Sequence, residues 1–208
     1  MYIPTYYREE NIDAIRAFIS ENSFAILISQ VYGKPWATHI PLLLDKGPNG
    51  KDILFGHISK ANKQWKEFKS DEEILVVFSG SHSYISPSCY DHMNVPTWNY
   101  VAVHIYGKLN IIEGDKLRNH LGKLINKYES DVEKPVHIDN IPKEYIAKEM
   151  RGIIGFEIEI SEIQCAKKLS QDKSEQNHKN IIKELERNGD SNSKEIAKLM
   201  KKETEAPN

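Results

Sequence analysis

The stretch "NVPTWNYVAVHIYG", residues 94–107, begins as a loop and continues as a strand with two unlike faces. One set of alternate positions is apolar and holds Val101, Val103 and Ile105. The other set carries large aromatic and polar side chains, namely Trp98, Tyr100, His104 and Tyr106. A period of two predicts a β-strand with one face in a hydrophobic core. The second face predicts that something other than ordinary core lies against this strand.

Other segments extend this strand into a sheet with helical insertions. Apolar runs predict strands over 24–29, 36–45, 52–58, 73–80 and 152–166. Turn signals at 33–35 and 46–50 separate the first three strands, and the second turn predicts a hairpin. Helical spacing predicts helices over 11–22, 59–68, 114–130, 142–150, 175–187 and 193–203, the first of them capped by Asn11.

The order of these elements predicts the fold class. Strands and helices follow one another without the regular alternation of a parallel β–α–β fold. We therefore expect an α+β fold in which an antiparallel sheet closes into a barrel with helices outside it. Residues 80–99 are predicted to form a long functional loop, because loops of this length are uncommon in compact domains.

The composition excludes some classes of protein. The formal net charge is -2, so no overall basic field attracts nucleic acid. Two cysteines, Cys89 and Cys165, provide neither a disulfide framework nor a zinc site, and they indicate a reducing compartment. The N-terminus lacks the pattern of a signal peptide, and no apolar run approaches the roughly 20 residues of a membrane span. We expect a soluble, cytoplasmic protein without a membrane partner.

Histidines on separate strands raise the question of a metal site. His39, His57 and His104 each fall in a predicted strand, and neighbouring strands of a barrel would bring their imidazoles together. No Asp or Glu accompanies them in a ligand-like spacing, so polar residues at a barrel rim explain them better than a transition metal or haem. No metal ligand is predicted. No catalytic residue is predicted either, because the sequence contains no motif of nucleophilic catalysis.

Two basic turns carry the chemistry of a phosphate site. In "GHISKANKQW", residues 56–65, a strand passes into a predicted helix at Ser59, Lys60 and Asn62. A helix N-terminus with a hydroxyl and a cation suits a phosphate monoester, although capping by Ser and a solvated Lys explain these residues equally well. The turn "AKKLSQD", residues 166–172, repeats this chemistry, and an ordinary basic turn is again the alternative. With the aromatic strand face, the two turns predict a planar ligand with a phosphate tail, a description that fits FMN.

Six blocks of sequence follow one another in an order typical of one family. They are "MYIPTYYREENIDAIRAFI", "ATHIPLLLD", "GHISKANKQW", "VVFSGSHSYISPSCY", "VPTWNYVAVHIYGKL" and "KKLSQDK", and they cover about residues 1–185. The blocks resemble the PaiB family of FMN-binding negative transcriptional regulators. The resemblance implies a split barrel over residues 1–170, like that of flavin reductases and pyridoxamine-phosphate oxidases, and a helical C-terminal tail over residues 171–208. It also implies a bacterial homodimer with flavin at the subunit interface, which represses genes for sporulation and secreted proteases.

The resemblance and the two turns together define a candidate flavin site. Trp98 and Tyr100 would flank the ring. His39, His57 and Asn99 would form hydrogen bonds to its edge. Lys60, Ser59 or Lys168 would hold the phosphate, and Lys60 stands where the family commonly has Arg. The predicted cofactor-binding residues are Thr38, His39, His57, Ser59, Lys60, Asn62, Trp98, Asn99, Tyr100, Lys168, Ser170 and Gln171.

Three functions remain open at this point. A flavin-binding regulator is preferred to a flavin-dependent oxidoreductase, because the sequence contains no nicotinamide-binding fingerprint. A direct DNA-binding repressor would use the two tail helices as a helix-turn-helix. Residues 165–208, however, hold ten Lys and Arg against eight Asp and Glu, a balance typical of a solvated helix or a packing arm. Indirect repression is therefore favoured over direct DNA binding.

Overall fold

The structure is a computed structural model that describes residues 1–205, so the last three residues of the predicted tail lie outside the described range. The strands are β1 (Phe24–Val31), β2 (Lys34–Pro41), β3 (Leu43–Lys46), β4 (Asp52–Ser59), β5 (Glu73–Ile85), β6 (Thr97–Ile112) and β7 (Ile153–Lys168). The α-helices are α1 (Ile12–Glu21), α2 (Gly114–Glu129), α3 (Lys143–Met150), α4 (Glu175–Asn188) and α5 (Ser191–Glu205). Short 3-10 turns are η1 (Thr5–Tyr7), η2 (Lys63–Glu67), η3 (Pro87–Cys89) and η4 (Ile138–Asn140).

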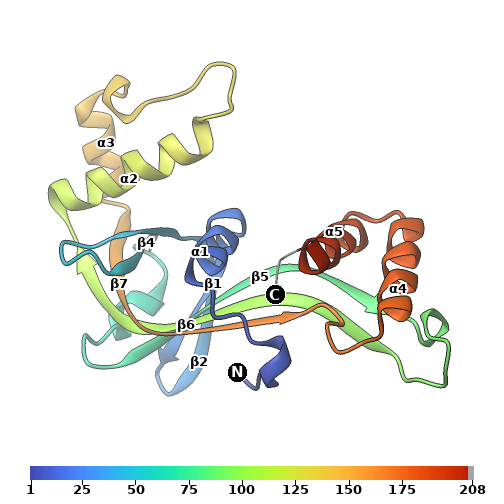
Figure 1. The fold of residues 1–208 in the computed structure, drawn as a ribbon. Helices are drawn as coiled ribbons and strands as arrows, with labels where there is room; N and C mark the ends of the chain where they lie inside the picture. Colours follow the sequence, from blue (N-terminus) through green and yellow to red (C-terminus); the bar gives the residue numbers. More distant parts are fainter. Residues whose placement is uncertain (206–208) are drawn as a thin grey trace. The chain divides into compact units, whose positions relative to one another are not determined.

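The predicted α+β fold is confirmed. The seven strands form one antiparallel sheet in the order β2-β1-β5-β6-β7-β4-β3, and the helices lie outside the strands (Figure 1). The chain forms two compact units. The first, called the barrel unit, comprises residues 19–77 and 105–163. The second, called the terminal unit, comprises residues 1–18, 78–104 and the described chain from 164 onward.

Three long strands, β5, β6 and β7, run through both units. Each of them has part of its residues in the barrel unit and the rest in the terminal unit. The predicted boundary at residue 170, between a barrel domain and a helical tail, stays a prediction.

A single residue shows that the sheet of the barrel unit curls back on itself. Strands β2 and β3 are the two edges of the sheet, yet only Leu42 separates them in the chain. Leu42 is fully buried, and its backbone N–H donates to the Ser23 carbonyl over 2.8 Å. A Cβ built on Gly56 of β4 would lie only 2.4 Å from Leu42 Cδ2, so Leu42 packs directly on that strand. This arrangement is that of a split barrel whose edges meet at one corner.

Local sequence explains the ends of several elements. Asn11 caps α1 as predicted, since its Oδ1 accepts from the backbone N–H groups of Asp13 at 3.0 Å and Ala14 at 3.2 Å. The hairpin turn between β1 and β2 falls at Tyr32 and Gly33, with φ of 51° and 73°. Positive φ at both central residues is the type I′ geometry that matches the twist of paired strands.

Three predicted elements were wrong in extent. The strand expected over 36–45 breaks at Leu42, because β2 pairs with β1 and β3 pairs with β4. The helix expected over 59–68 is only the 3-10 turn η2, because Ser59 ends β4 and the side chain of Asn62 accepts from Gln64 N to start a single turn. The loop expected over 80–99 is shorter, because β5 continues to Ile85 and β6 begins at Thr97.

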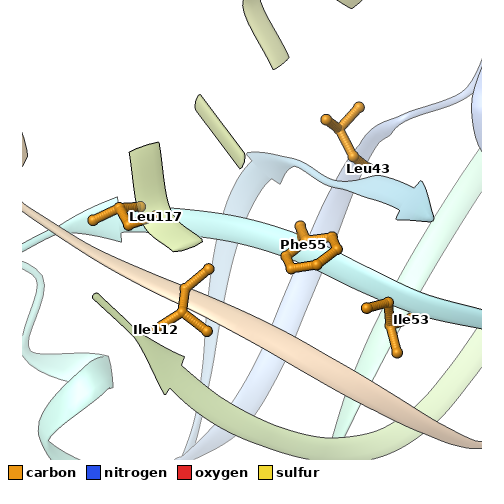
Figure 2. Packing of buried hydrophobic residues seen from close by; sticks show 5 residues of the cluster. All are labelled: Leu43, Ile53, Phe55, Ile112 and Leu117. Carbon is orange, nitrogen blue, oxygen red and sulfur yellow. The ribbon is translucent and has the colours of Figure 1, made fainter. Parts of the chain in front are cut away.

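Helix α2 packs against an apolar cluster of the barrel unit, whose five buried side chains are drawn in Figure 2. Strand β4 directs alternate side chains to opposite faces. Ile53 and Phe55 of β4 form a buried cluster with Leu43 of β3, Ile112 of β6 and Leu117 of α2. The helix is amphipathic as predicted, and Leu121 and Leu124 on the same face pack against this cluster.

Strands β6 and β7 approach so closely that one glycine position admits no side chain. A Cβ on Gly107 would lie 2.4 Å from the Glu159 carbonyl oxygen and 2.7 Å from Ile158 Cγ2. Because the first contact is with backbone, we expect Gly107→Ala to reduce the free energy of unfolding by about 3 kcal/mol. Urea denaturation measures this, with Gly47→Ala as the control, since its nearest contacts are side-chain atoms at 3.3 Å or more. Equal losses in both variants would contradict the prediction.

Candidate functional site

The twelve predicted cofactor-binding residues divide between the two units. Six lie in the barrel unit and six in the terminal unit. The barrel unit holds Thr38, His39, His57, Ser59, Lys60 and Asn62, and the terminal unit holds Trp98, Asn99, Tyr100, Lys168, Ser170 and Gln171. The predicted residues therefore form two half-sets of six, one in the barrel unit and one in the terminal unit, and each half-set is described within its own unit.

In the barrel unit, Thr38 and Asn62 belong to a hydrogen-bond network around Gln64. Gln64 is fully buried; its Oε1 accepts from Thr38 Oγ1 and its Nε2 donates to Ser29 Oγ over 3.0 Å. The same Nε2 lies 3.4 Å from the Leu27 carbonyl and 3.3 Å from the Trp36 carbonyl. Asn62 Nδ2 donates to Thr38 Oγ1 over 2.9 Å. Thr38 and Asn62 thus fasten η2 to β2, and Gln64 fastens it to β1. No motif singled out Gln64, and its role depends on partners far away in the chain.

His57 lies on the face of β4 that carries Phe55, and its ring neighbour is His120 of α2. The ring centroids of His57 and His120 are 6.0 Å apart, and the ring of His120 stacks on Phe55 at 5.4 Å. Burial lowers the pKa of His57. Burial, with the added charges of His57 and Lys123, lowers the pKa of His120 to about 4. The sequence did contain a signal for His120, which occupies the apolar stripe that Leu117, Leu121 and Leu124 define.

Ser59 and Lys60 lie at the end of β4 in exposed positions. Ser59 Oγ accepts from Ala61 N over 3.2 Å, and the backbone N–H of Lys60 donates to the Gly152 carbonyl over 2.8 Å. The side chain of Lys60 makes no ion pair with any residue from 1 to 205. Lys60, Arg151 and Glu113 line a pocket of about 270 Å³ at the start of α2, so two cations and one carboxylate border this cavity.

His39 lies apart from His57 in the sheet. It is exposed on β2, with its ring 6.2 Å from that of Phe24. The strands that carry His39, His57 and His104 are β2, β4 and β6, and no two of these are hydrogen-bonded neighbours. In the described part of the chain, no three His, Cys, Asp or Glu side chains gather as a metal site would require.

In the terminal unit, the alternation of β6 separates the predicted residues. Asn99 is fully buried on one face, whereas Trp98 and Tyr100 point to the other. Asn99 Nδ2 donates to Ser170 Oγ over 3.0 Å, and this hydroxyl lies 3.1 Å from Asn99 Oδ1. Asn99 Nδ2 also donates to Met200 Sδ over 3.5 Å, and this contact fixes α5 to β6.

Lys168 and Gln171 make further contacts inside the terminal unit. The ammonium of Lys168 donates to Thr97 Oγ1 and lies 5.7 Å from the ring centroid of Tyr7. Gln171 Oε1 accepts from Leu169 N over 2.7 Å, so the side chain closes its own turn. Thr97 and Asn99 share one strand face, and Trp98 belongs to the opposite face. The predicted cation and the predicted tryptophan therefore point to different sides of β6.

Both cysteines are buried and free. Burial raises the pKa of Cys89, and burial followed by the charge of Glu9 raises the pKa of Cys165 to about 12. A protonated thiol is a poor nucleophile and a poor metal ligand. The described surroundings thus give neither cysteine a reactive character.

Comparison with known proteins identifies the family. The family described as "Putative FMN-binding domain" matches residues 1–162. "Protease synthase and sporulation protein PAI 2" of Bacillus subtilis (strain 168) is 42% identical over 203 residues, which cover 96% of each chain. The chain belongs to the PaiB family. An uncharacterised protein of Emericella nidulans is 28% identical over 99% of this chain and 98% of its own.

Solved structures agree with the split-barrel fold of the PaiB family at low sequence identity. The flavocytochrome Anf3 from Azotobacter vinelandii superimposes with a TM-score of 0.56 at 20% identity, covering 80% of this chain and 72% of that one. The FAD and heme binding protein from Mycobacterium smegmatis has a TM-score of 0.58 at 12% identity, covering 78% of this chain and 73% of that one.

No helix among residues 1–205 has both the length and the apolar character needed to cross a bilayer.

Proposed function

We propose that this chain is an FMN-binding regulator that lowers the expression of secreted-protease and sporulation genes. The observation that carries the proposal is the 42% identity to PAI 2 of Bacillus subtilis along 96% of both chains. Identity at this level over nearly all of both chains supports a shared role more strongly than a shared fold alone does. The alternative of a flavin-dependent oxidoreductase rests on fold relatives at 20% identity or less, which support only the fold.

The two cations of the pocket at Lys60 support the FMN part of the proposal. Lys60 and Arg151 provide two cations against the one carboxylate of Glu113, and α2 begins at Gly114 on the same pocket wall. Cationic side chains and the N–H groups of a helix start both favour a phosphate. In this proposal Ser59 and His57, which belong to the same unit as Lys60, lie beside the phosphate end. Bound FMN would supply redox chemistry, whereas these side chains would bind and orient it.

The Lys60 cation can be tested by FMN titration. We expect purified protein to quench the fluorescence of added FMN and to show a flavin absorption band. Lys60→Ala should weaken FMN binding roughly tenfold, because a charge-assisted hydrogen bond to phosphate is lost. Lys60→Arg should preserve or improve binding, since a guanidinium binds phosphate through two N–H groups. Lys63→Ala, at an exposed position three residues later, is the matched control. Absence of FMN binding in the unmodified protein would refute the flavin part of the proposal.

The regulatory role is tested separately in a Bacillus subtilis strain that lacks PAI 2. We expect expression of this chain to lower secreted protease activity and protease transcript levels in that strain. Unchanged transcripts, with the protein present in soluble form, would contradict the regulatory role whatever the result with FMN.

Repression through a partner or a small molecule is preferred to direct DNA contact. Helices α4 and α5 bury Ile181, Leu185, Ile196 and Met200, so these apolar faces are used for packing. We also propose that the chain acts as a homodimer. Light scattering measures the mass in solution, and a gel-shift at low salt with protease promoter DNA measures direct binding.

A further inference from the structure

A shallow groove in the terminal unit has a floor of three aromatic rings. The groove has a volume of about 440 Å³, and its floor comprises His82 and Tyr84 of β5 and Trp98 of β6. The ring of Trp98 lies 5.8 Å from that of His82 and 6.0 Å from that of Tyr84, between centroids. Tyr84 and Trp98 are 47% and 51% exposed, far more than aromatic residues of a core. About half of the surface of Tyr84 and Trp98 is therefore accessible to a ligand in the groove.

The rim of this groove is the turn between α4 and α5. Asn188 ends α4, and Asp190 and Asn192 surround the start of α5. Gly189 has a φ of 80°, a left-handed conformation that ends α4 and lets the chain reverse within a few residues. Ser83 Oγ of β5 and Ser193 Oγ of α5 are 2.9 Å apart and both buried. This contact holds the rim against the strand that carries two of the rings.

The groove carries a net negative charge. No Lys or Arg lines it, and the carboxylate of Asp190 makes no ion pair with any residue in the described range. The negative end of α4 and the positive end of α5 meet at this turn and offset each other. Asp190 Oδ1 accepts from Ser193 N over 2.9 Å, and the hydrogen bonds from Ser193 lower the pKa of Asp190. The carboxylate is therefore ionised at neutral pH, and its charge is not neutralised by a cation.

This chemistry disfavours an anion and favours an organic cation. The faces of aromatic rings are negative, and a cation over Trp is attracted most strongly. A phosphate would meet the rings and a carboxylate without any counter-charge, so the groove is unsuited to FMN or a nucleic acid backbone. We propose that the groove binds an ammonium or guanidinium group on an apolar stem, seated on Trp98 and neutralised by Asp190. The proposal goes beyond the flavin-binding role and does not depend on it.

The two amides on the rim add hydrogen-bonding capacity for such a ligand. The side chains of Asn188 and Asn192 make no side-chain hydrogen bond within residues 1–205. Their carbonyl oxygens can accept N–H groups that the carboxylate leaves free. The apolar stem would lie along Tyr84, since an aromatic ring buries alkyl groups without loss of a polar contact.

The proposal is tested by calorimetric titration of the full chain with n-butylammonium. 1-Butanol and butyrate serve as neutral and anionic ligands of similar size. We expect saturable binding of the ammonium only. Asp190→Asn should weaken it three- to tenfold or more, as loss of an ion pair and cation–π geometry implies. Because Asn caps helices as well as Asp does, Asp190→Asn changes the charge and keeps the start of α5. Trp98→Leu should have a similar effect, and Tyr84→Phe should have none.

Several outcomes would overturn the proposal. They are equal binding of butanol and butylammonium, unchanged ammonium binding in Asp190→Asn, and no saturable heat up to about 100 mM ligand. Asp131→Asn, an exposed substitution in the barrel unit, is the matched control for charge. Titration with a peptide that ends in Lys, compared with the same peptide ending in Gln, shows whether the groove binds a cation carried by a protein as well as a free amine. FMN titration of Asp190→Asn should be unchanged, so failure at the groove is separable from failure of the proposed function.

Discussion

Replacement of Gln64 by Ala is expected to reduce the free energy of unfolding by roughly 3–5 kcal/mol, a large share of the stability of a domain. The fully buried amide donates toward Ser29 Oγ and the carbonyls of Leu27 and Trp36, and it accepts from Thr38 Oγ1. Its removal leaves several buried polar groups without a partner and also leaves a cavity. Urea denaturation followed by far-UV circular dichroism measures the loss.

A second substitution separates hydrogen bonding from volume. Gln64→Glu keeps the size of the side chain but replaces the donating Nε2 with an oxygen that faces two carbonyls. We expect a loss of at least about 3 kcal/mol at pH 7, because a charge is buried without a donor. The matched controls are Gln176→Ala and Gln176→Glu, at an exposed position of α4, which should change stability by no more than about 0.5 kcal/mol. A stable Gln64→Glu protein would show that the network is not a determinant of the fold.

Acid is expected to destabilise the protein by about 3 kcal/mol through His120. Its ring is 2% exposed, and neither ring nitrogen has a hydrogen-bond partner within the described range. Burial first, then the charges of His57 and Lys123, lower its pKa from 6.5 to about 4 in the folded protein. Above pH 7 the imidazole is neutral in both states, so its titration does not change the free energy of unfolding there. Between pH 6.5 and 4 only the unfolded state takes up the proton, so stability falls as pH falls.

The His120 effect is measured as the slope of unfolding free energy against pH. One proton contributes about 1.4 kcal/mol per pH unit across this window. His120→Leu should flatten the slope by that amount and raise stability at pH 7 by about 1 kcal/mol, because two unpaired nitrogens leave the apolar layer. His137→Leu, at an exposed position, is the control. If the slope for His120→Leu equals that of the unmodified protein, other groups are responsible for acid sensitivity.

Periodicity predicted those elements whose pattern is local. The alternation of β6 and the apolar stripes of α2, α4 and α5 depend on nearest neighbours in the chain, and these elements lie where the sequence indicated. The break at Leu42 is different, because it depends on β3 pairing with β4 instead of β1. Likewise β5 extends through a Ser- and His-rich segment because it lies beside β6 in the sheet. Such segments have weak intrinsic strand preference, and tertiary pairing overrides it.

The candidate site was predictable in chemistry and less so in arrangement. Because side chains alternate along a strand, Asn99 lies on the face opposite Trp98 and Tyr100. The prediction that all three contact one flavin therefore conflicts with the two-residue period that predicted the strand. The network of Thr38, Asn62 and Gln64 joins residues 24–37 positions apart, which no local pattern reveals. Whether the two half-sets of predicted residues serve one flavin stays a prediction.

The corner at Leu42 has a consequence for how this family can change in length during evolution. Side chains alternate along strands, so one added or deleted residue at the corner would turn every side chain of β3 to the wrong face. Leu42 itself is buried against Gly56, which leaves no room for a bulge. Insertions are tolerated in exposed segments outside the sheet, as between α2 and η4. Length variation among homologues is therefore expected in such surface segments and not at residue 42.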